Sequence, residues 1–196
     1  MLLLQAAGAA AYLLLVRPGL LRWGATEGEA ARPLPGDDIV PRPHIGATRA
    51  ISVNAPPEAV WPWLVQMGGH PRAGWYAYDH ITNDGRPSAD RIVPELQRLE
   101  VGDLLRTPPS GIGYTVERIV PGREIVLAVR AFHVTVSWAI VLLGTEEHSR
   151  LLFRLRIRCR PGLRGLVYLL LSESADFLVT RRQLITIKAL AEAHKH

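Results

Sequence analysis

Apolar and polar residues alternate along several stretches of the second half of the chain. The clearest case spans residues 150–160, where the odd-numbered positions from Leu151 to Cys159 are apolar and five of the six even-numbered positions are arginine. A period of two places these sets on opposite faces of a β-strand, one buried and one facing water. Weaker patterns of the same kind predict strands over residues 48–54, 103–106, 114–120, 124–130 and 134–142.

Helical spacing of apolar residues predicts two helices that flank these strands. Within residues 58–67, Val60, Leu64 and Met67 recur at steps of four and three, and Gly68-Gly69 ends the helix. Near the C-terminus, the same spacing forms a longer apolar stripe of Phe177, Thr180, Leu184, Ile187 and Ala191. The stripe predicts a long terminal helix, and we interpret the apolar run 166–171 before it as helical too.

The predicted order of elements is strand, helix, loop, a series of antiparallel strands and a terminal helix, which is an α+β arrangement. A sheet with one apolar face buries that face against another layer, and only the terminal helix is long enough to cover it. We therefore predict a curved antiparallel sheet wrapped around a long C-terminal helix, with a hydrophobic helix at the N-terminus. One helix does not fill the concave side of such a sheet, so we expect an apolar cavity suited to a small ligand.

The N-terminal segment is strongly apolar from residue 2 to residue 16, and Arg17, Arg22 and Trp23 follow it. With Arg17 reaching toward lipid head groups, residues 2–23 are long enough to serve as a membrane anchor, with Arg22 and Trp23 at the interface. Positive charge only after the segment predicts a membrane-anchored protein with its domain on the cytoplasmic side. Two alternatives are a helix packed on its own, cytoplasmic, domain and a cleaved signal peptide, which normally carries positive charge before the apolar run.

Composition supports one folded domain with an appendage. The chain has 196 residues, of which 48% are hydrophobic and 21% are charged, as expected of a protein with a substantial core. Four prolines and several glycines between residues 24 and 47 are typical of a linker. The predicted organisation is a membrane-anchor helix over 1–23, a Pro/Gly-rich linker over 24–47 and a folded domain over 48–196.

Several motifs in this domain resemble one known superfamily. They are TRAISVNAPPEAVWPWLVQM at 48–67, GWYAYD at 74–79, PELQ at 94–97, VGD at 101–103, and the closing helix with Asp176-Phe177 and Arg181-Arg182. Together they resemble the SRPBCC, or START-like, superfamily, near its bacterial polyketide cyclase/dehydrase and lipid-transport group. The resemblance covers nearly all of residues 48–194 and implies a helix-grip fold with an apolar pocket. It implies no single chemistry, because members of one fold bind, carry or transform different molecules.

Large apolar and aromatic residues are the candidates for lining the cavity. Aromatic side chains with polar atoms suit the wall or mouth of a ligand pocket, although the same residues can instead form solid core. The predicted ligand-binding residues are Met67, Trp75, Tyr76, Tyr78, Tyr114, Trp138, Phe153, Phe177 and Leu184.

Catalytic residues are harder to identify from this sequence. Asp79, Glu95 and His133 are weak candidates for orienting a ligand or moving a proton, and each has an ordinary structural interpretation. The histidines lack the spacing of metal ligands, and the chain has no glycine-rich phosphate loop, so we expect neither a metal nor a cofactor. The lone cysteine, Cys159, is interpreted as a buried structural thiol.

The arginines of residues 150–160 are the most unusual charge feature of a chain with a net charge of +5. We interpret them first as a solvated outer face of the sheet. Anionic lipid head groups at Arg154, Arg156 and Arg158 are the second interpretation. We do not expect nucleic acid as a partner, because no binding motif accompanies the arginines.

Three functions remain open at this level. The first is binding of a small hydrophobic molecule, lipid-like or polyketide-like, in the cavity near a membrane. The second is a cyclase- or dehydratase-type enzyme that uses polar residues in the same cavity, which we rank below binding. The third is a membrane-tethered interaction module that uses the arginine face.

Overall fold

The computed structural model describes residues 12–107 and 113–194. Within them, a single antiparallel sheet has the strand order β1-β6-β5-β4-β3-β2. The alternating patterns correctly predicted every one of these strands, and β1 begins three residues before its predicted start. The strands are β1 (Ile45–Val53), β2 (Leu104–Arg106), β3 (Gly113–Val120), β4 (Glu124–Arg130), β5 (Val134–Gly144) and β6 (Ser149–Cys159).

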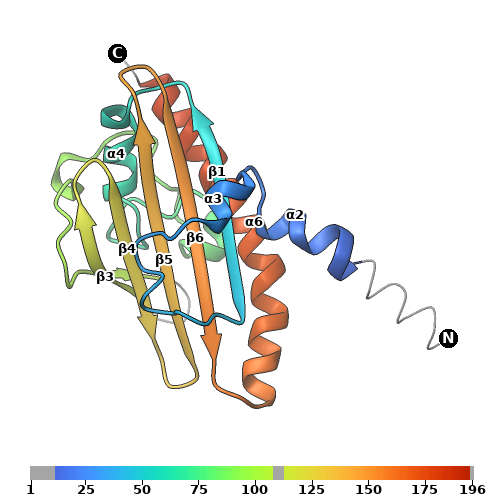
Figure 1. The fold of residues 1–196 in the computed structure, drawn as a ribbon. Helices are drawn as coiled ribbons and strands as arrows, with labels where there is room; N and C mark the ends of the chain where they lie inside the picture. Colours follow the sequence, from blue (N-terminus) through green and yellow to red (C-terminus); the bar gives the residue numbers. More distant parts are fainter. Residues whose placement is uncertain (1–11, 108–112, 195–196) are drawn as a thin grey trace.

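Helix α6 (Leu163–Ala193) runs along one face of this sheet (Figure 1). Thr180, Leu184, Ile187 and Ala191 of its predicted stripe are buried, and Phe177 is half-buried. The shorter elements α4 (Pro57–Val65), α5 (Asp79–Thr82) and η2 (Pro94–Leu96) lie in the long connection from β1 to β2. The main core packs between α4, α6 and the inward faces of the strands, so the curved sheet around a terminal helix is confirmed.

The N-terminal segment is docked against this domain over its described part, which comprises η1 (Tyr12–Val16) and α2 (Arg17–Leu21). Arg17 forms a hydrogen-bonded ion pair with Glu173 of α6, with a shortest N···O distance of 2.8 Å. Trp23 packs on the main core, and its carbonyl accepts a hydrogen bond of 3.1 Å from the Ala50 amide. The edge strand β1 thus offers Trp23 a backbone partner, and the side chain of Trp23 is half-buried against the domain.

Residues 1–11 of the predicted membrane anchor 1–23 lie outside the described part of the chain. Among residues 12–107 and 113–194, no helix combines the length and the apolar character that a bilayer crossing requires.

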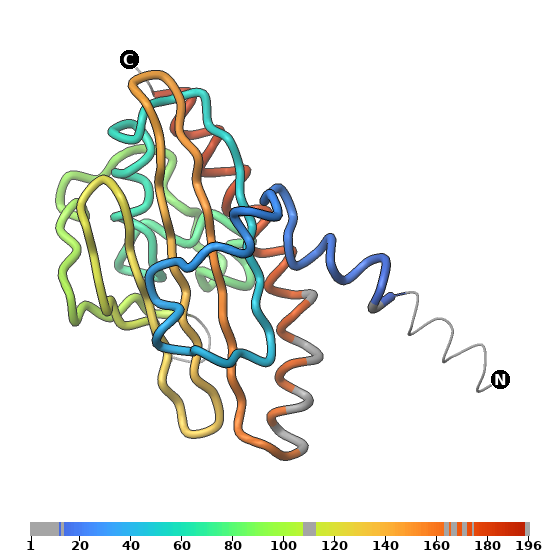
Figure 2. The backbone as a smooth tube through the Cα atoms, in the orientation of Figure 1, coloured from blue at the N-terminus to red at the C-terminus, as the bar shows by residue number. Residues whose placement is uncertain are grey.

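Residues 24–44, which we call the outer segment, cross the other face of the sheet (Figure 2). The segment contains the short helix α3 (Glu27–Ala31) and buries Leu34 and Val40. Its Leu34 joins a second apolar cluster with the outward-facing Ala139, Val141 and Leu152 of the sheet. The stretch with linker composition is thus a packed layer, and the sheet is covered on both faces.

Arg154 of β6 holds this outer segment in place. Its guanidinium donates to the carbonyl oxygens of Glu29, Ala30 and Arg32 at 2.7–2.9 Å and pairs with Asp37 at 2.8 Å. The side chain is therefore buried, and a solvated arginine face was the wrong interpretation at this position. The physical reason is that the backbone carbonyls of an irregular segment have no partners in a helix or sheet and need other hydrogen-bond donors. One arginine side chain has five N–H donors.

Candidate functional site

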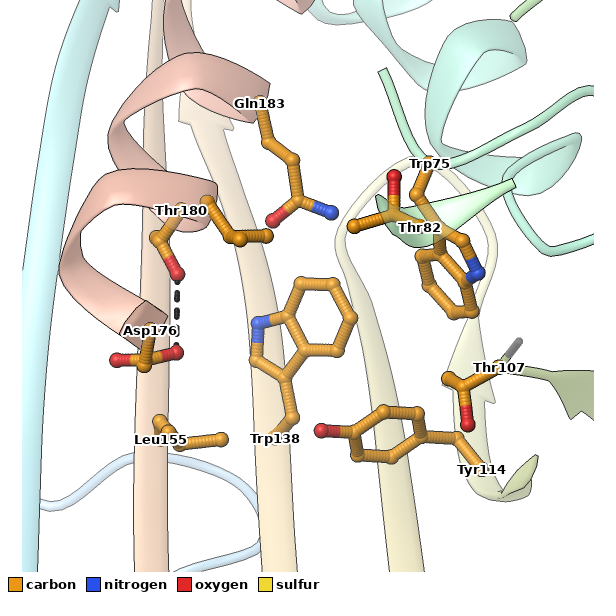
Figure 3. Close-up of a pocket in the computed structure, with 10 residues that line it drawn as sticks. Trp75, Thr82, Thr107, Tyr114, Trp138, Leu155, Asp176, Thr180 and Gln183 are labelled. Atoms are coloured by element: carbon orange, nitrogen blue, oxygen red, sulfur yellow. Dashed lines mark hydrogen bonds between the residues drawn. The ribbon is translucent and has the colours of Figure 1, made fainter. Parts of the chain in front are cut away.

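A cavity of about 150 Å³ lies between the sheet and α6 (Figure 3). One side of it is aromatic and is built from the loop after α4 and from strands β3 and β5. The opposite side is a polar stretch of α6. The lining residues are Trp75, Thr82, Thr107, Tyr114, Trp138, Leu155, Asp176, Val179, Thr180 and Gln183.

Three aromatic rings contact one another along the sheet side of the cavity. The ring centroid of Trp138 lies 5.7 Å from that of Trp75 and 5.4 Å from that of Tyr114. The Phe153 ring packs edge-on against Trp138, with a centroid distance of 5.2 Å. Tilted and edge-on contacts at these separations are favourable. The rings therefore support one another as a rigid wall rather than needing a ligand to hold them apart.

Trp75 is fixed by the loop that carries it. Its Nε1 donates to the Arg106 carbonyl at 3.1 Å. The residue before it, Gly74, has a φ of +89°, and a Cβ there would lie 2.3 Å from the Ser88 hydroxyl. Only glycine fits this position, so the GWY motif has a local structural reason and places an indole ring at the cavity.

The helix side of the cavity carries a carboxylate whose charge is already balanced. Asp176 pairs with Arg49 of β1, which is 1% exposed, and accepts a hydrogen bond of 3.1 Å from the Thr180 hydroxyl. Arg49 also donates to the Leu20 carbonyl of α2 at 3.0 Å. A buried guanidinium needs such partners, and the arrangement links the cavity wall to the N-terminal segment.

Three other polar groups at the cavity lack partners. Within the described residues, no hydrogen bond is made by the Gln183 amide, the Trp138 Nε1–H or the Tyr114 hydroxyl, although Gln183 is only 3% exposed. All three side chains line the cavity, and in the view of Figure 3 the Gln183 amide lies above the indole ring of Trp138 and the Tyr114 hydroxyl below it. Burial, together with the nearby Asp176 and Tyr168, raises the pKa of Tyr114 above its usual value, so its hydroxyl remains protonated and able to donate.

The structure brings three of the nine predicted ligand-binding residues to this cavity: Trp75, Tyr114 and Trp138. The others lie elsewhere. Met67, Tyr76, Phe153 and Leu184 are buried in the core, Phe177 packs near Arg49, and Tyr78 is exposed. Sequence reasoning missed Gln183 and Asp176 as cavity residues, although a glutamine directly before Leu184 of the apolar stripe was a usable signal.

The three weak catalytic candidates lie apart from the cavity and from one another. Asp79 accepts hydrogen bonds from the Ser88 amide and hydroxyl at 3.0 and 2.6 Å, which ties its loop together. Glu95 is exposed in η2, and His133 is exposed in the turn between β4 and β5. Cys159 is buried, and burial raises the pKa of its thiol. Among the described residues, no cluster of His, Cys, Asp and Glu is arranged to hold a metal ion.

The strand order, the long connection between β1 and β2, and the terminal helix packed on the sheet together decide the fold class. The chain has a START-like, helix-grip fold. This agrees with the resemblance seen in its motifs. No protein-family model matches the sequence, and no curated protein matches it.

Solved structures similar to this helix-grip chain include a hypothetical protein, jhp0584, from Helicobacter pylori. It is 14% identical, with 82% of this chain and 96% of that chain covered, and the TM-score is 0.54. A START superfamily protein from Mycobacterium smegmatis is 14% identical over 74% of this chain and 98% of its own, with a TM-score of 0.43. DynU16, a protein in the dynemicin biosynthetic locus, is 15% identical over 73% of this chain and 47% of its own, also at 0.43.

Proposed function

We propose that the chain binds a small, largely apolar molecule that carries hydrogen-bonding groups, in the cavity between the sheet and α6. The observation that carries this proposal is that three polar side chains, Gln183, Trp138 and Tyr114, line one aromatic-walled cavity without a hydrogen-bond partner among the described residues. Polar groups that face a cavity nearly always have hydrogen-bond partners in the protein, in water or in a ligand, so groups that find none in the protein call for a reason. A bound molecule that supplies the missing partners is such a reason.

The size of the cavity limits what fits inside it. A volume of about 150 Å³ is comparable to that of engineered apolar cavities that bind benzene. Ligand pockets for drug-sized molecules are larger, about 300–1,000 Å³. We infer that the enclosed part of the ligand is a single ring or a short branched chain.

The polar atoms around the cavity define the complementary groups on the ligand. Trp138 offers one donor, Tyr114 a hydroxyl, and the Gln183 amide both donors and an acceptor. A carbonyl or hydroxyl oxygen on the ligand would satisfy these groups. Asp176 is already neutralised by Arg49, so a cationic ligand gains little there. Binding is favoured over turnover because Asp79, Glu95 and His133 all lie outside the cavity.

Filling the cavity tests this proposal. The full chain is purified and analysed by native mass spectrometry and by organic extraction, next to a Val179→Phe variant that places a ring in the cavity. Leu178→Phe is the matched control, because the neighbouring Leu178 is exposed on the same helix. We expect a co-purifying apolar molecule in the natural chain and in the control, and its loss from Val179→Phe. Equal amounts in all three proteins would contradict the assignment of this cavity.

A further inference from the structure

One end of the sheet carries cations without matching acids. The stretches 42–46, 130–135 and 156–165 together contain six arginines, two histidines and no aspartate or glutamate. Two of these arginines pair with acids from outside the stretches, Arg130 with Glu117 and Arg156 with Asp37. Within the described residues, the exposed Arg158 and Arg160 at the end of β6 have no acidic partner.

An exposed aromatic ring lies among these cations. Phe132, in the turn between β4 and β5, is 73% exposed. The guanidinium carbon of Arg160 lies 4.6 Å from its ring centroid, and the ring of His133 contacts it at the same distance. The Arg160 amide donates to the His133 carbonyl at 2.9 Å, which joins the turn to β6. We call Phe132, His133, Arg158 and Arg160 the basic tip.

The start of α6 lies at the same end of the molecule as the basic tip (Figures 1 and 2). Its first nine residues, 163–171, read LRGLVYLLL, with one charge among seven apolar side chains. Tyr168 within them is 42% exposed. Exposed aromatic rings such as Phe132 and Tyr168, together with unpaired arginines, are typical of surfaces that enter the head-group region of a bilayer.

We propose that the basic tip docks on a membrane that contains anionic lipids. Phe132 enters the head-group region, while Arg158 and Arg160 bind lipid phosphates. This moves the lipid contact predicted from the arginine pattern away from Arg154 and Arg156, which bind the outer segment, to the end of β6. A single protruding ring next to an exposed arginine fits a lipid surface better than a nucleic-acid strand, which needs successive stacking platforms along a groove.

Vesicle co-sedimentation of the full chain tests the charged part of this inference. The vesicles are phosphatidylcholine alone or phosphatidylcholine with 30% phosphatidylglycerol. We expect the natural chain to prefer the anionic vesicles, and the Arg158→Gln/Arg160→Gln variant to bind them about 30-fold more weakly, as loss of two surface cations implies. The control is Arg98→Gln/Arg123→Gln, two exposed arginines outside the basic tip, which should keep the preference. Equal binding to both vesicle types by the natural chain, or equal losses in variant and control, would overturn the proposal.

A second measurement follows Phe132 directly and does not depend on removing charge. A Phe132→Cys variant is labelled with an environment-sensitive dye, while the buried Cys159 is poorly reactive. Anionic vesicles should shift the dye emission to the blue, and neutral vesicles should shift it less. An unshifted emission with bound vesicles, or a shift produced by a single-stranded oligonucleotide instead, would count against lipid docking.

Discussion

At the scale of single residues, two buried glutamines differ in what surrounds their amides. Gln66 donates to the Arg91 carbonyl at 3.1 Å and accepts from the Val93 amide at 3.0 Å. Gln183 has no such partner among the described residues and faces the cavity. The first glutamine ties a loop to α4, whereas the second fits a binding role better than a structural one.

Replacing each glutamine with leucine should separate these roles. Gln183→Leu removes a cavity-lining amide that makes no hydrogen bond within the described residues, so the free energy of unfolding should stay level or rise by about 1 kcal/mol, while the co-purifying molecule is lost. Gln66→Leu leaves buried backbone groups unpaired and should destabilise the chain by about 2–3 kcal/mol. Urea denaturation measures both, and a large destabilisation by Gln183→Leu would show that its amide is structural.

The ion pair between Arg49 and Asp176 should be costly to break from one side. Asp176→Leu leaves a guanidinium that is 1% exposed without its counter-charge, and we expect a loss of about 3 kcal/mol. The double variant Arg49→Met/Asp176→Leu should recover most of this loss, because no unpaired charge remains. With the single variant Arg49→Met included, thermal and urea unfolding of the natural chain and the three variants form a double-mutant cycle, and additive losses would refute the coupling.

At the scale of elements, the strands could be predicted because a period of two is read directly from side-chain polarity. The outer segment could not, because it is held mainly by Arg154 binding backbone carbonyls, which leave no pattern in sequence. The residues around the cavity could not be predicted from side-chain polarity alone. Trp138 and Phe153 share the apolar face of the sheet, yet only Trp138 lines the cavity, since the difference depends on what α6 leaves uncovered.

The contact between Glu29 of helix α3 and Arg150 should make the free energy of unfolding depend on pH in the acid range. Hydrogen bonds from Arg150, at 2.7 and 2.8 Å, lower the pKa of Glu29 to about 2. The folded pKa lies below the unfolded value, so the contact stabilises fully above about pH 5 and is lost as the pH falls toward 2. With solvent screening, we expect a contribution of about 1–2 kcal/mol. Urea titrations at several pH values measure how the free energy of unfolding falls with pH. This pH dependence should be weaker in Glu29→Gln and unchanged in Glu27→Gln, whose carboxylate is exposed.

At the scale of the whole molecule, the N-terminal segment, the cavity and the sheet edge are joined through α6. Arg17 binds Glu173, and Arg49 contacts both the Leu20 carbonyl and Asp176. The segment predicted as an anchor is therefore attached, over residues 17–23, to the same helix that forms one wall of the cavity.

Removing one of these contacts should loosen the segment without unfolding the domain. For Glu173→Gln we expect faster amide hydrogen exchange in residues 17–23, with the melting temperature changed by no more than about 2 °C, since partly exposed ion pairs contribute little. Glu192→Gln, which removes the i,i+4 pair with Lys188 on the same helix, is the control. Unchanged exchange in residues 17–23 would show that Arg17 does not hold them.

The hydrogen bonds from Arg154 to the outer segment also determine when this segment can pack during synthesis of the chain. The carbonyl of Glu29 and its donor on β6 are 125 residues apart in the chain. At about 5–20 residues per second, a ribosome needs roughly 6–25 s to make the intervening stretch. Through that interval Leu34 and Val40 emerge without the strands that later bury them. The outer segment is thus synthesised before the strands on which it packs, and it packs only after β6 has been made. Chaperones that bind nascent chains would meet this segment first.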